Sequence, residues 1–100
     1  MARRVIWAPK AQRDLFDCFD YIFADHPPNA DLVRNRILKR VTSLSDMTTG
    51  RPGRVFGTFE ALVTKTSMII CYELPDKQTL HVLRIIHAKR SWPDEGWPEK

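Results

Sequence analysis

Five basic residues in two parts of the chain are the clearest candidates for a binding function. Arg51 and Arg54 lie in a glycine-rich segment, and Arg84, Lys89 and Arg90 lie toward the end of the chain. Guanidinium groups match phosphate and carboxylate oxygens with two parallel hydrogen bonds. If adjacent strands bring the two parts together, the cluster suits a nucleic-acid backbone or an acidic partner protein. The alternative is an ordinary solvated surface, and composition alone does not separate the two.

His87 offers a second kind of chemistry, because it follows Arg84 closely and an imidazole can accept a proton. In an RNA-cleaving site, His87 would take the proton of a 2′-hydroxyl while Arg84 or Arg54 stabilises the charge on the phosphate. Glu60 or Tyr72 would assist. The alternative is a histidine at the end of a strand, hydrogen-bonded to the backbone.

Other common kinds of site have no support in the sequence. No grouping of histidines, cysteines or carboxylates has the spacing of metal ligands, so neither a metal nor a cofactor is expected. The glycine-rich segment 50–54 follows a predicted helix and precedes a strand, which is the wrong order for a phosphate-binding loop. The serines have no neighbouring histidine and acid that would indicate a hydrolase triad.

The length and charge of the chain limit the possible architectures. One hundred residues, 43% hydrophobic and 28% charged, predict a single domain over residues 1–100, because two domains would each be too small for a core. The net charge is +4, which favours anionic partners. Residues 91–100 form a short tail in which Trp92 and Trp97 are expected to pack back onto the fold or to insert into a partner.

Several features indicate a soluble, cytoplasmic protein. Cys18 and Cys71 are far apart and have no CxxC spacing, which is typical of buried free thiols in a reducing compartment. No apolar run approaches the roughly 18 residues of a membrane span, and no apolar stretch follows the first arginines as in a signal peptide.

The first half of the chain predicts a strand followed by two helices. Residues 3–7 are β-rich, and Pro9 suits the first turn of a helix that continues to about Asp25 with apolar residues every three or four positions. Prolines at 27 and 28 end that pattern, and Asn29 is expected to cap a second helix over residues 30–44. So short a connection predicts an antiparallel helical hairpin.

The second half of the chain predicts three antiparallel strands after a loop over residues 45–57. The strands are expected at residues 55–63, 68–74 and 79–87, separated by hairpin turns at 64–67 and 75–78. The fold class is therefore α+β, in the order β-α-α-β-β-β. The last strand is apolar on both faces, while two helices can cover only one face of a sheet. An apolar face is thus expected to be left for a partner segment or for the tail.

The order of these features resembles a known family. The chain has Trp7-x-Pro9-x-Ala11, then Gly50-Arg51-Pro52-Gly53-Arg54 and Gly57-Thr58-x-Glu60, then a strand containing Tyr72, and finally Ile86-His87-x-x-Arg90-x-Trp92-Pro93. Over residues 5–93 this set is similar to toxins of the RelE/ParE superfamily of type II toxin-antitoxin systems, closer to the ParE branch. The predicted layout agrees with that family's fold.

The resemblance implies a small basic toxin that a cognate antitoxin, ParD-like or similar, holds inactive in a heterotetramer or larger assembly. ParE-like members are associated with inhibition of DNA gyrase, and RelE-like members with cleavage of messenger RNA on the ribosome. Phe59 stands where the family's nucleases usually carry an arginine before the glutamate, and no tyrosine follows Tyr72. Gyrase inhibition without catalysis is therefore expected, with ribosome-dependent RNA cleavage or a non-toxic, basic protein-binding module as alternatives.

The resemblance also limits how far site residues can be assigned. No catalytic residue is assigned under the gyrase hypothesis. Under the nuclease alternative the candidates are His87, Arg84, Arg54, Glu60 and Tyr72. The residues expected to bind an anion or a partner are Arg51, Arg54, Arg84, Lys89, Arg90 and Trp92.

Overall fold

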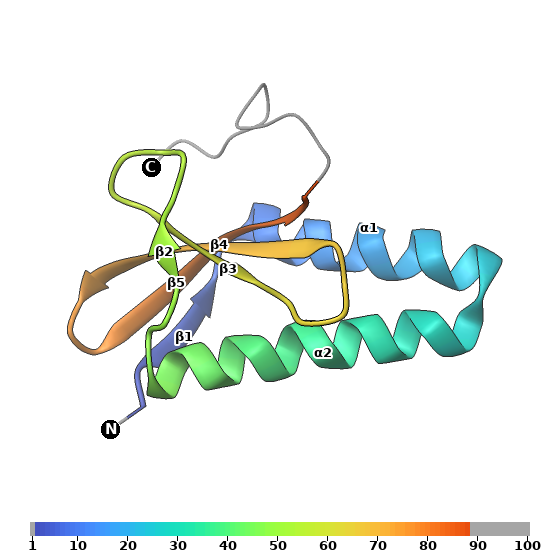
Figure 1. Cartoon of the computed structure of the whole chain (residues 1–100), viewed down its shortest axis with the longest axis horizontal. Helices are drawn as coiled ribbons and strands as arrows, with labels where there is room; N and C mark the ends of the chain where they lie inside the picture. The colour runs from blue at the N-terminus through green and yellow to red at the C-terminus, as the bar shows by residue number, and fades with distance from the viewer. Residues whose placement is uncertain (1, 89–100) are drawn as a thin grey trace.

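The computed structural model describes residues 2–88 and has the α+β architecture expected from the sequence (Figure 1). Two antiparallel helices lie against one face of a five-stranded mixed sheet. Its strands, in spatial order, are β1 (Arg4–Trp7), β5 (Thr79–His87), β4 (Met68–Asp76), β3 (Phe59–Leu62) and β2 (Arg51–Pro52). Strand β1 runs parallel to β5, and the other neighbours are antiparallel.

The sheet differs from the prediction mainly around its shortest strands. The two-residue strand β2 lies inside the segment predicted as a loop, and β3 is shorter than the predicted strand over residues 55–63. Strand β4 continues past the predicted end at residue 74 to Asp76, into the segment predicted as a hairpin turn. The shortening of β3 has a local cause, because residues 55–58 form a turn. The Thr58 amide and hydroxyl both donate to the Val55 carbonyl, at 3.1 and 2.6 Å. Gly57 adopts a φ of +84°, a conformation that favours glycine.

Helix α1 (Pro9–Asp25) has the predicted bounds, whereas helix α2 (Pro27–Asp46) begins earlier than predicted. Both prolines belong to the first turn of α2, where a missing N–H removes no helical hydrogen bond. The predicted cap, Asn29, was wrong. His26 caps the helix instead, because its Nδ1 accepts a hydrogen bond from the Asn29 amide at 3.2 Å.

The core lies between the helices and one face of the sheet. Ile37, Val41 and Leu44 of α2 pack with Ile70 of β4 and Val82 of β5, and all five are buried. Cross-strand partners share a face of a sheet, so the register places Met68, Ile70 and Tyr72 on this helix-covered face.

The opposite face of the sheet is not open, contrary to expectation. Ile69, Cys71, Leu83 and Ile86 are each at most 4% exposed. Part of the cover comes from the turn before β3, since buried Thr58 contacts the Cys71 thiol. The tail at residues 91–100, the other predicted cover, lies outside the described residues.

Candidate functional site

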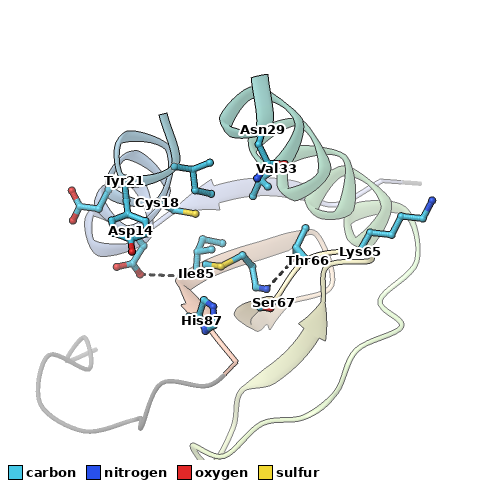
Figure 2. Close-up of a pocket in the computed structure, with 13 residues that line it drawn as sticks. Asp14, Cys18, Tyr21, Asn29, Val33, Lys65, Thr66, Ser67, Ile85 and His87 are labelled. Atoms are coloured by element: carbon cyan, nitrogen blue, oxygen red, sulfur yellow. Dashed lines mark hydrogen bonds between the residues drawn. The ribbon is translucent and has the colours of Figure 1, made fainter. Parts of the chain in front are cut away.

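A groove of about 490 Å³ opens between the helical hairpin and the end of the sheet (Figure 2). Cys18 and Tyr21 of α1 and Val33 of α2 form two of its sides. The turn between β3 and β4, together with Ile85 and the exposed His87 of β5, completes it. The groove therefore combines an apolar interior with polar groups at its margin, as sites for a partner segment commonly do.

Helix α1 carries aromatic side chains that the sheet does not cover. In α1 only Ala11 is fully buried, whereas Tyr21 is 82% exposed and Phe16 and Phe23 are also exposed. Tyr21 lines the groove. By helical spacing Phe16 and Phe23 lie on another side of α1, where Phe19 stacks on Phe23 with ring centroids 5.6 Å apart. An exposed tyrosine at the edge of a preformed groove is characteristic of an interaction site.

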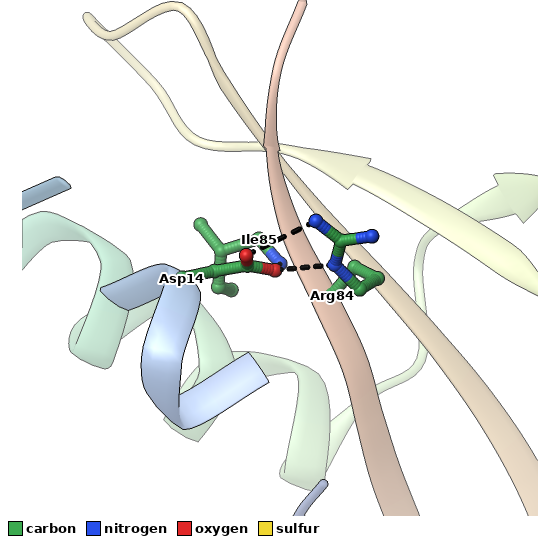
Figure 3. Close-up of polar contacts among 3 residues, drawn as sticks. All are labelled: Asp14, Arg84 and Ile85. Carbon is green, nitrogen blue, oxygen red and sulfur yellow. Dashed lines mark hydrogen bonds and ion pairs between the residues drawn. The ribbon is translucent and has the colours of Figure 1, made fainter. Parts of the chain in front are cut away.

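Arg84, one of the predicted anion-binding residues, is held by Asp14 of α1 (Figure 3). Asp14 accepts hydrogen bonds from Arg84 Nε at 2.6 Å and Nη2 at 3.1 Å, and its Oδ2 also accepts from the Ile85 amide at 3.0 Å. Both side chains are about 15% exposed. Within the described chain β1 pairs with β5 only as far as Val82. Beyond that point Asp14, in place of a β1 carbonyl, accepts the hydrogen bond of a β5 amide, that of Ile85.

Of the predicted cluster, Arg51 and Arg54 lie beside the buried carboxylate of Glu60, whereas Arg84 pairs with Asp14 of α1. Arg51 is opposite Glu60 in the β2–β3 register, and the Arg54 amide donates to Glu60 Oε2 at 2.8 Å. Arg54 Nε lies 3.7 Å from the same oxygen, and Glu60 is only 4% exposed. Burial raises the pKa of the adjacent Cys71 thiol to about 12, and the charge of Glu60 adds to the rise.

Tyr72 lies on the other face of the sheet, inside the core. Its ring is fully buried and stacks on Phe59, with centroids 5.6 Å apart. Its hydroxyl accepts a hydrogen bond from the Gly50 amide at 3.1 Å, and burial raises its pKa. A hydroxyl held in this way is inaccessible to an RNA substrate.

The five candidates for a nuclease site therefore do not share one surface. His87 is opposite Met68 on the helix-covered face, whereas Glu60 and Arg84 are the partners of Cys71 on the opposite face. Lys89, Arg90 and Trp92 lie outside the described residues. Within residues 2–88 no group of three or more histidines, cysteines and carboxylates is placed to hold a metal ion, and no helix could span a membrane.

The sequence did not reveal the groove. Cys18, Ile22 and Val33 fall on the apolar stripes of their helices, where burial in the core is the usual expectation. The available signal was Tyr21, an aromatic residue of the predicted first helix that lines the groove.

Comparison with known proteins decides the family. The profile of the family described as "ParE toxin of type II toxin-antitoxin system, parDE" matches residues 5–92. The chain belongs to the ParE toxin family. Y4kP of Sinorhizobium fredii, a protein named as a candidate toxin, is 33% identical over 92 residues, which are 91% of this chain and 94% of that protein.

Two solved structures share the fold of this ParE family member. A chain of the chromosomal ParDE toxin-antitoxin system from P. aeruginosa superposes with a TM-score of 0.79 at 21% identity, covering 88% of this chain and 98% of that one. A chain of the RelBE2 toxin-antitoxin complex from Mycobacterium tuberculosis gives 0.63 at 24% identity, covering 87% and 92%. The expected RelE/ParE architecture is thus confirmed.

Proposed function

We propose that this ParE family member is a cytoplasmic toxin, that a cognate antitoxin neutralises it by docking in the groove between the helical hairpin and the sheet, and that its target is DNA gyrase. The observation that carries the antitoxin site is the exposed Tyr21 of α1 at the edge of a preformed groove with an apolar interior. The ParDE and RelBE2 structures, which are of toxin-antitoxin systems, support a partner of this kind.

The chemistry of the groove indicates an amphipathic segment as its occupant. An amphipathic helix binds such a groove through apolar anchors spaced three or four residues apart. Cys18, Ile22 and Val33 provide apolar contacts for those anchors. Lys65 and His87 at the margin offer donors to polar or acidic residues that flank them.

Tyr21→Ala tests the antitoxin site directly. Tyr21 is 82% exposed and contributes little to the fold, so its loss is expected to weaken antitoxin binding about tenfold or more without changing stability. Phe56→Ala is the matched control, because Phe56 is an aromatic residue that is 99% exposed in the turn before β3. Isothermal titration calorimetry with the antitoxin of the adjacent reading frame measures both. Equal affinities for the two variants would place the antitoxin elsewhere.

The gyrase assignment rests on the absence of an assembled nuclease site among the described residues. Inhibition by binding needs a surface, whereas RNA cleavage needs a proton acceptor, a proton donor and a phosphate clamp around one substrate. Here Tyr72 is buried in the core, Glu60 is buried beside Arg54, and Arg84 is bound by Asp14. These placements favour inhibition without catalysis.

Two assays separate the possible targets. The purified toxin is expected to inhibit supercoiling by gyrase, and the antitoxin is expected to reverse that inhibition. In cells, expression of His87→Ala is expected to arrest growth as expression of the native chain does. Normal supercoiling at excess toxin contradicts the proposal. Cleaved transcripts that become intact in His87→Ala would indicate the ribosome-dependent nuclease, and unimpaired growth would indicate a non-toxic binding module.

A further inference from the structure

A second groove, of about 530 Å³, is lined almost entirely by groups that bind anions. It lies between α2 and the turn that joins β3 to β4, which run side by side in Figure 1. Arg36, Lys39 and Arg40 come from α2, and Lys65 comes from the turn. Among the described residues that line it none is acidic, and the hydroxyls of Ser43 and Thr64 add neutral donors.

The helical spacing explains why these cations share one surface. Positions 36, 39, 40 and 43 follow the three- and four-residue spacing of a single helix face. From Arg36 to Ser43 the helix advances about 10 Å. That is close to the rise of about three nucleotides along one strand of a duplex, at about 3.4 Å each.

The guanidinium groups are positioned by neutral partners. Arg36 Nη1 donates to the Lys65 carbonyl at 3.3 Å, and Arg40 Nε donates to the Leu62 carbonyl at 3.1 Å. Arg40 Nη1 also lies 3.4 Å from the Thr49 hydroxyl. These bonds fix the arginines against the turn without neutralising them. This groove therefore differs from the surroundings of Arg54 and Arg84, which pair with the carboxylates of Glu60 and Asp14 respectively.

We propose that this basic groove, formed by Arg36, Lys39, Arg40 and Lys65, binds the phosphodiester backbone of a nucleic acid. Phosphate oxygens are contacted in proteins mainly by arginine, lysine and small hydroxyl-bearing side chains, which is the composition found here. Such contacts position a strand without reading its sequence, so binding is independent of sequence.

The lining of the basic groove favours a nucleic acid over an acidic peptide. Val63 is its one apolar member among the described residues, and it is only 1% exposed. A peptide would need buried apolar anchors to bind tightly, because exposed ion pairs alone contribute little. A polyanion gains affinity by releasing condensed counterions and needs no such anchor. The groove between α1, α2 and the end of the sheet, here called the aromatic groove, is the better surface for a protein segment, because Cys18, Ile22 and Val33 give it an apolar interior.

A matched pair of variants tests the basic groove in the full chain. Lys39→Gln/Lys65→Gln removes two exposed charges from the groove, while Lys10→Gln/Lys77→Gln removes two exposed lysines at the start of α1 and in the β4–β5 turn. Arg36 and Arg40, which contact the turn, are unchanged in both. Fluorescence anisotropy with a 20-mer duplex DNA, the single-stranded DNA and the matching RNA, from 50 to 200 mM KCl, reports affinity and salt dependence.

We expect the native chain to bind duplex DNA with a slope of log K against log [KCl] of about −3 to −4, for four neutralised phosphates. The groove variant is expected to lose about tenfold in affinity and to reduce that slope by up to about 2, while the control variant changes neither measurably. The three oligonucleotides distinguish DNA from RNA as the preferred source of the backbone.

Three results would overturn the proposal. An equal loss in both variants would mean that binding follows net charge alone. No binding to any oligonucleotide at 50 mM KCl would exclude the interaction. A polyglutamate peptide that binds as tightly as the oligonucleotides, and loses affinity in the groove variant, would identify an acidic protein segment as the ligand. None of these results depends on the gyrase or antitoxin assays.

Discussion

Asp14 is the residue on which the junction between helix and sheet most depends. A single carboxylate binds the guanidinium of Arg84 and the amide of Ile85, and it does so where β5 extends past the end of β1. It thereby replaces a missing neighbouring strand with a side chain from α1. The arrangement also explains why Arg84, prominent in the sequence as a candidate ligand for anions, has a structural role here.

Asp14→Ala is expected to lower the free energy of unfolding by about 3 kcal/mol, because a half-buried charge pair and a backbone hydrogen bond lose their common acceptor. Asp17→Ala is the control. Asp17 is well exposed and pairs with Arg13 at 3.5 Å one turn along the same helix, so its removal should change stability by less than about 0.5 kcal/mol. Urea denaturation of both variants measures the difference, and similar losses would contradict the assigned role.

Cys71 predicts a dependence of stability on alkaline pH. Its thiol is buried and its pKa is raised to about 12, whereas in the unfolded chain it titrates near its usual value of 9.0. Between these values the folded state binds more protons, so the free energy of unfolding should fall as pH rises, by up to about 1.4 kcal/mol per pH unit. Urea denaturation from pH 8 to 11 should show a shallower fall in Cys71→Ala, and parallel curves would contradict this.

At the scale of elements, one tyrosine helps to hold the short strand β2, which pairs with β3, at the edge of the sheet. The Tyr72 hydroxyl accepts the Gly50 amide hydrogen just before β2 begins, and a Cβ on Gly50 would contact both this hydroxyl and, at 2.8 Å, the Glu60 carbonyl oxygen. Glycine is therefore needed at position 50 for close approach. The same hydroxyl was a candidate catalytic group, and its environment indicates that it holds the sheet edge.

Tyr72→Phe is expected to destabilise the protein by about 1 kcal/mol through loss of that hydrogen bond, and to leave growth arrest intact. Tyr21→Phe removes a hydroxyl from a side chain that is largely exposed, and should have no effect on stability. Thermal unfolding and growth on expression are the two measurements. Loss of toxicity at unchanged stability would return Tyr72 to a catalytic role.

Elements with a clear period or a clear boundary could be predicted from the sequence. Helix α1 and strand β5 have the predicted bounds, because one has a strong apolar repeat and the other is bounded by a polar turn. Strand β2 has only two residues and no period to detect. The start of α2 was missed because paired prolines suggest a break, although both fit a first helical turn.

The candidate sites were harder to predict, because they depend on contacts between distant residues. Asp14 and Arg84 are 70 residues apart, and no local pattern pairs them. The basic groove needs both the face of α2 and the position of Lys65 in a turn, where it adopts a φ of +62°. The pairing of Arg54 with Glu60 and of Arg84 with Asp14 could not be predicted, because these partners meet only in the folded sheet.

At the scale of the whole molecule, the chain bears two separate surfaces on one helical hairpin. The aromatic groove faces the end of the sheet, and the basic groove lies along α2 beside the β3–β4 turn. Lys65 lines both grooves, whereas Arg36, Lys39 and Arg40 line only the basic one. An antitoxin in the first groove would therefore leave the α2 side of the basic groove accessible and would compete for Lys65.

Antitoxin binding is expected to stabilise the whole domain, because a ligand that binds only the folded state shifts the unfolding equilibrium. At a free antitoxin concentration of 100 times Kd the gain is about 2.7 kcal/mol, or about 10 °C or more in melting temperature for a chain of this size. Differential scanning fluorimetry should show that rise for the native chain and a smaller one for Tyr21→Ala. An equal rise for both would argue against the aromatic groove.

The pairing of β1 with β5 has a consequence for biosynthesis. Residues 4–7 find their partners only at residues 79–82, so β1 cannot join the sheet until β5 has left the ribosome. Contacts this remote in sequence form late, since a long loop must be ordered first. A nascent chain that stops before residue 79 would lack Ile85 and His87, and with them one side of the groove proposed for the antitoxin. That docking surface is therefore completed only when β5 has been made, so an antitoxin could bind it only from that moment in synthesis onward.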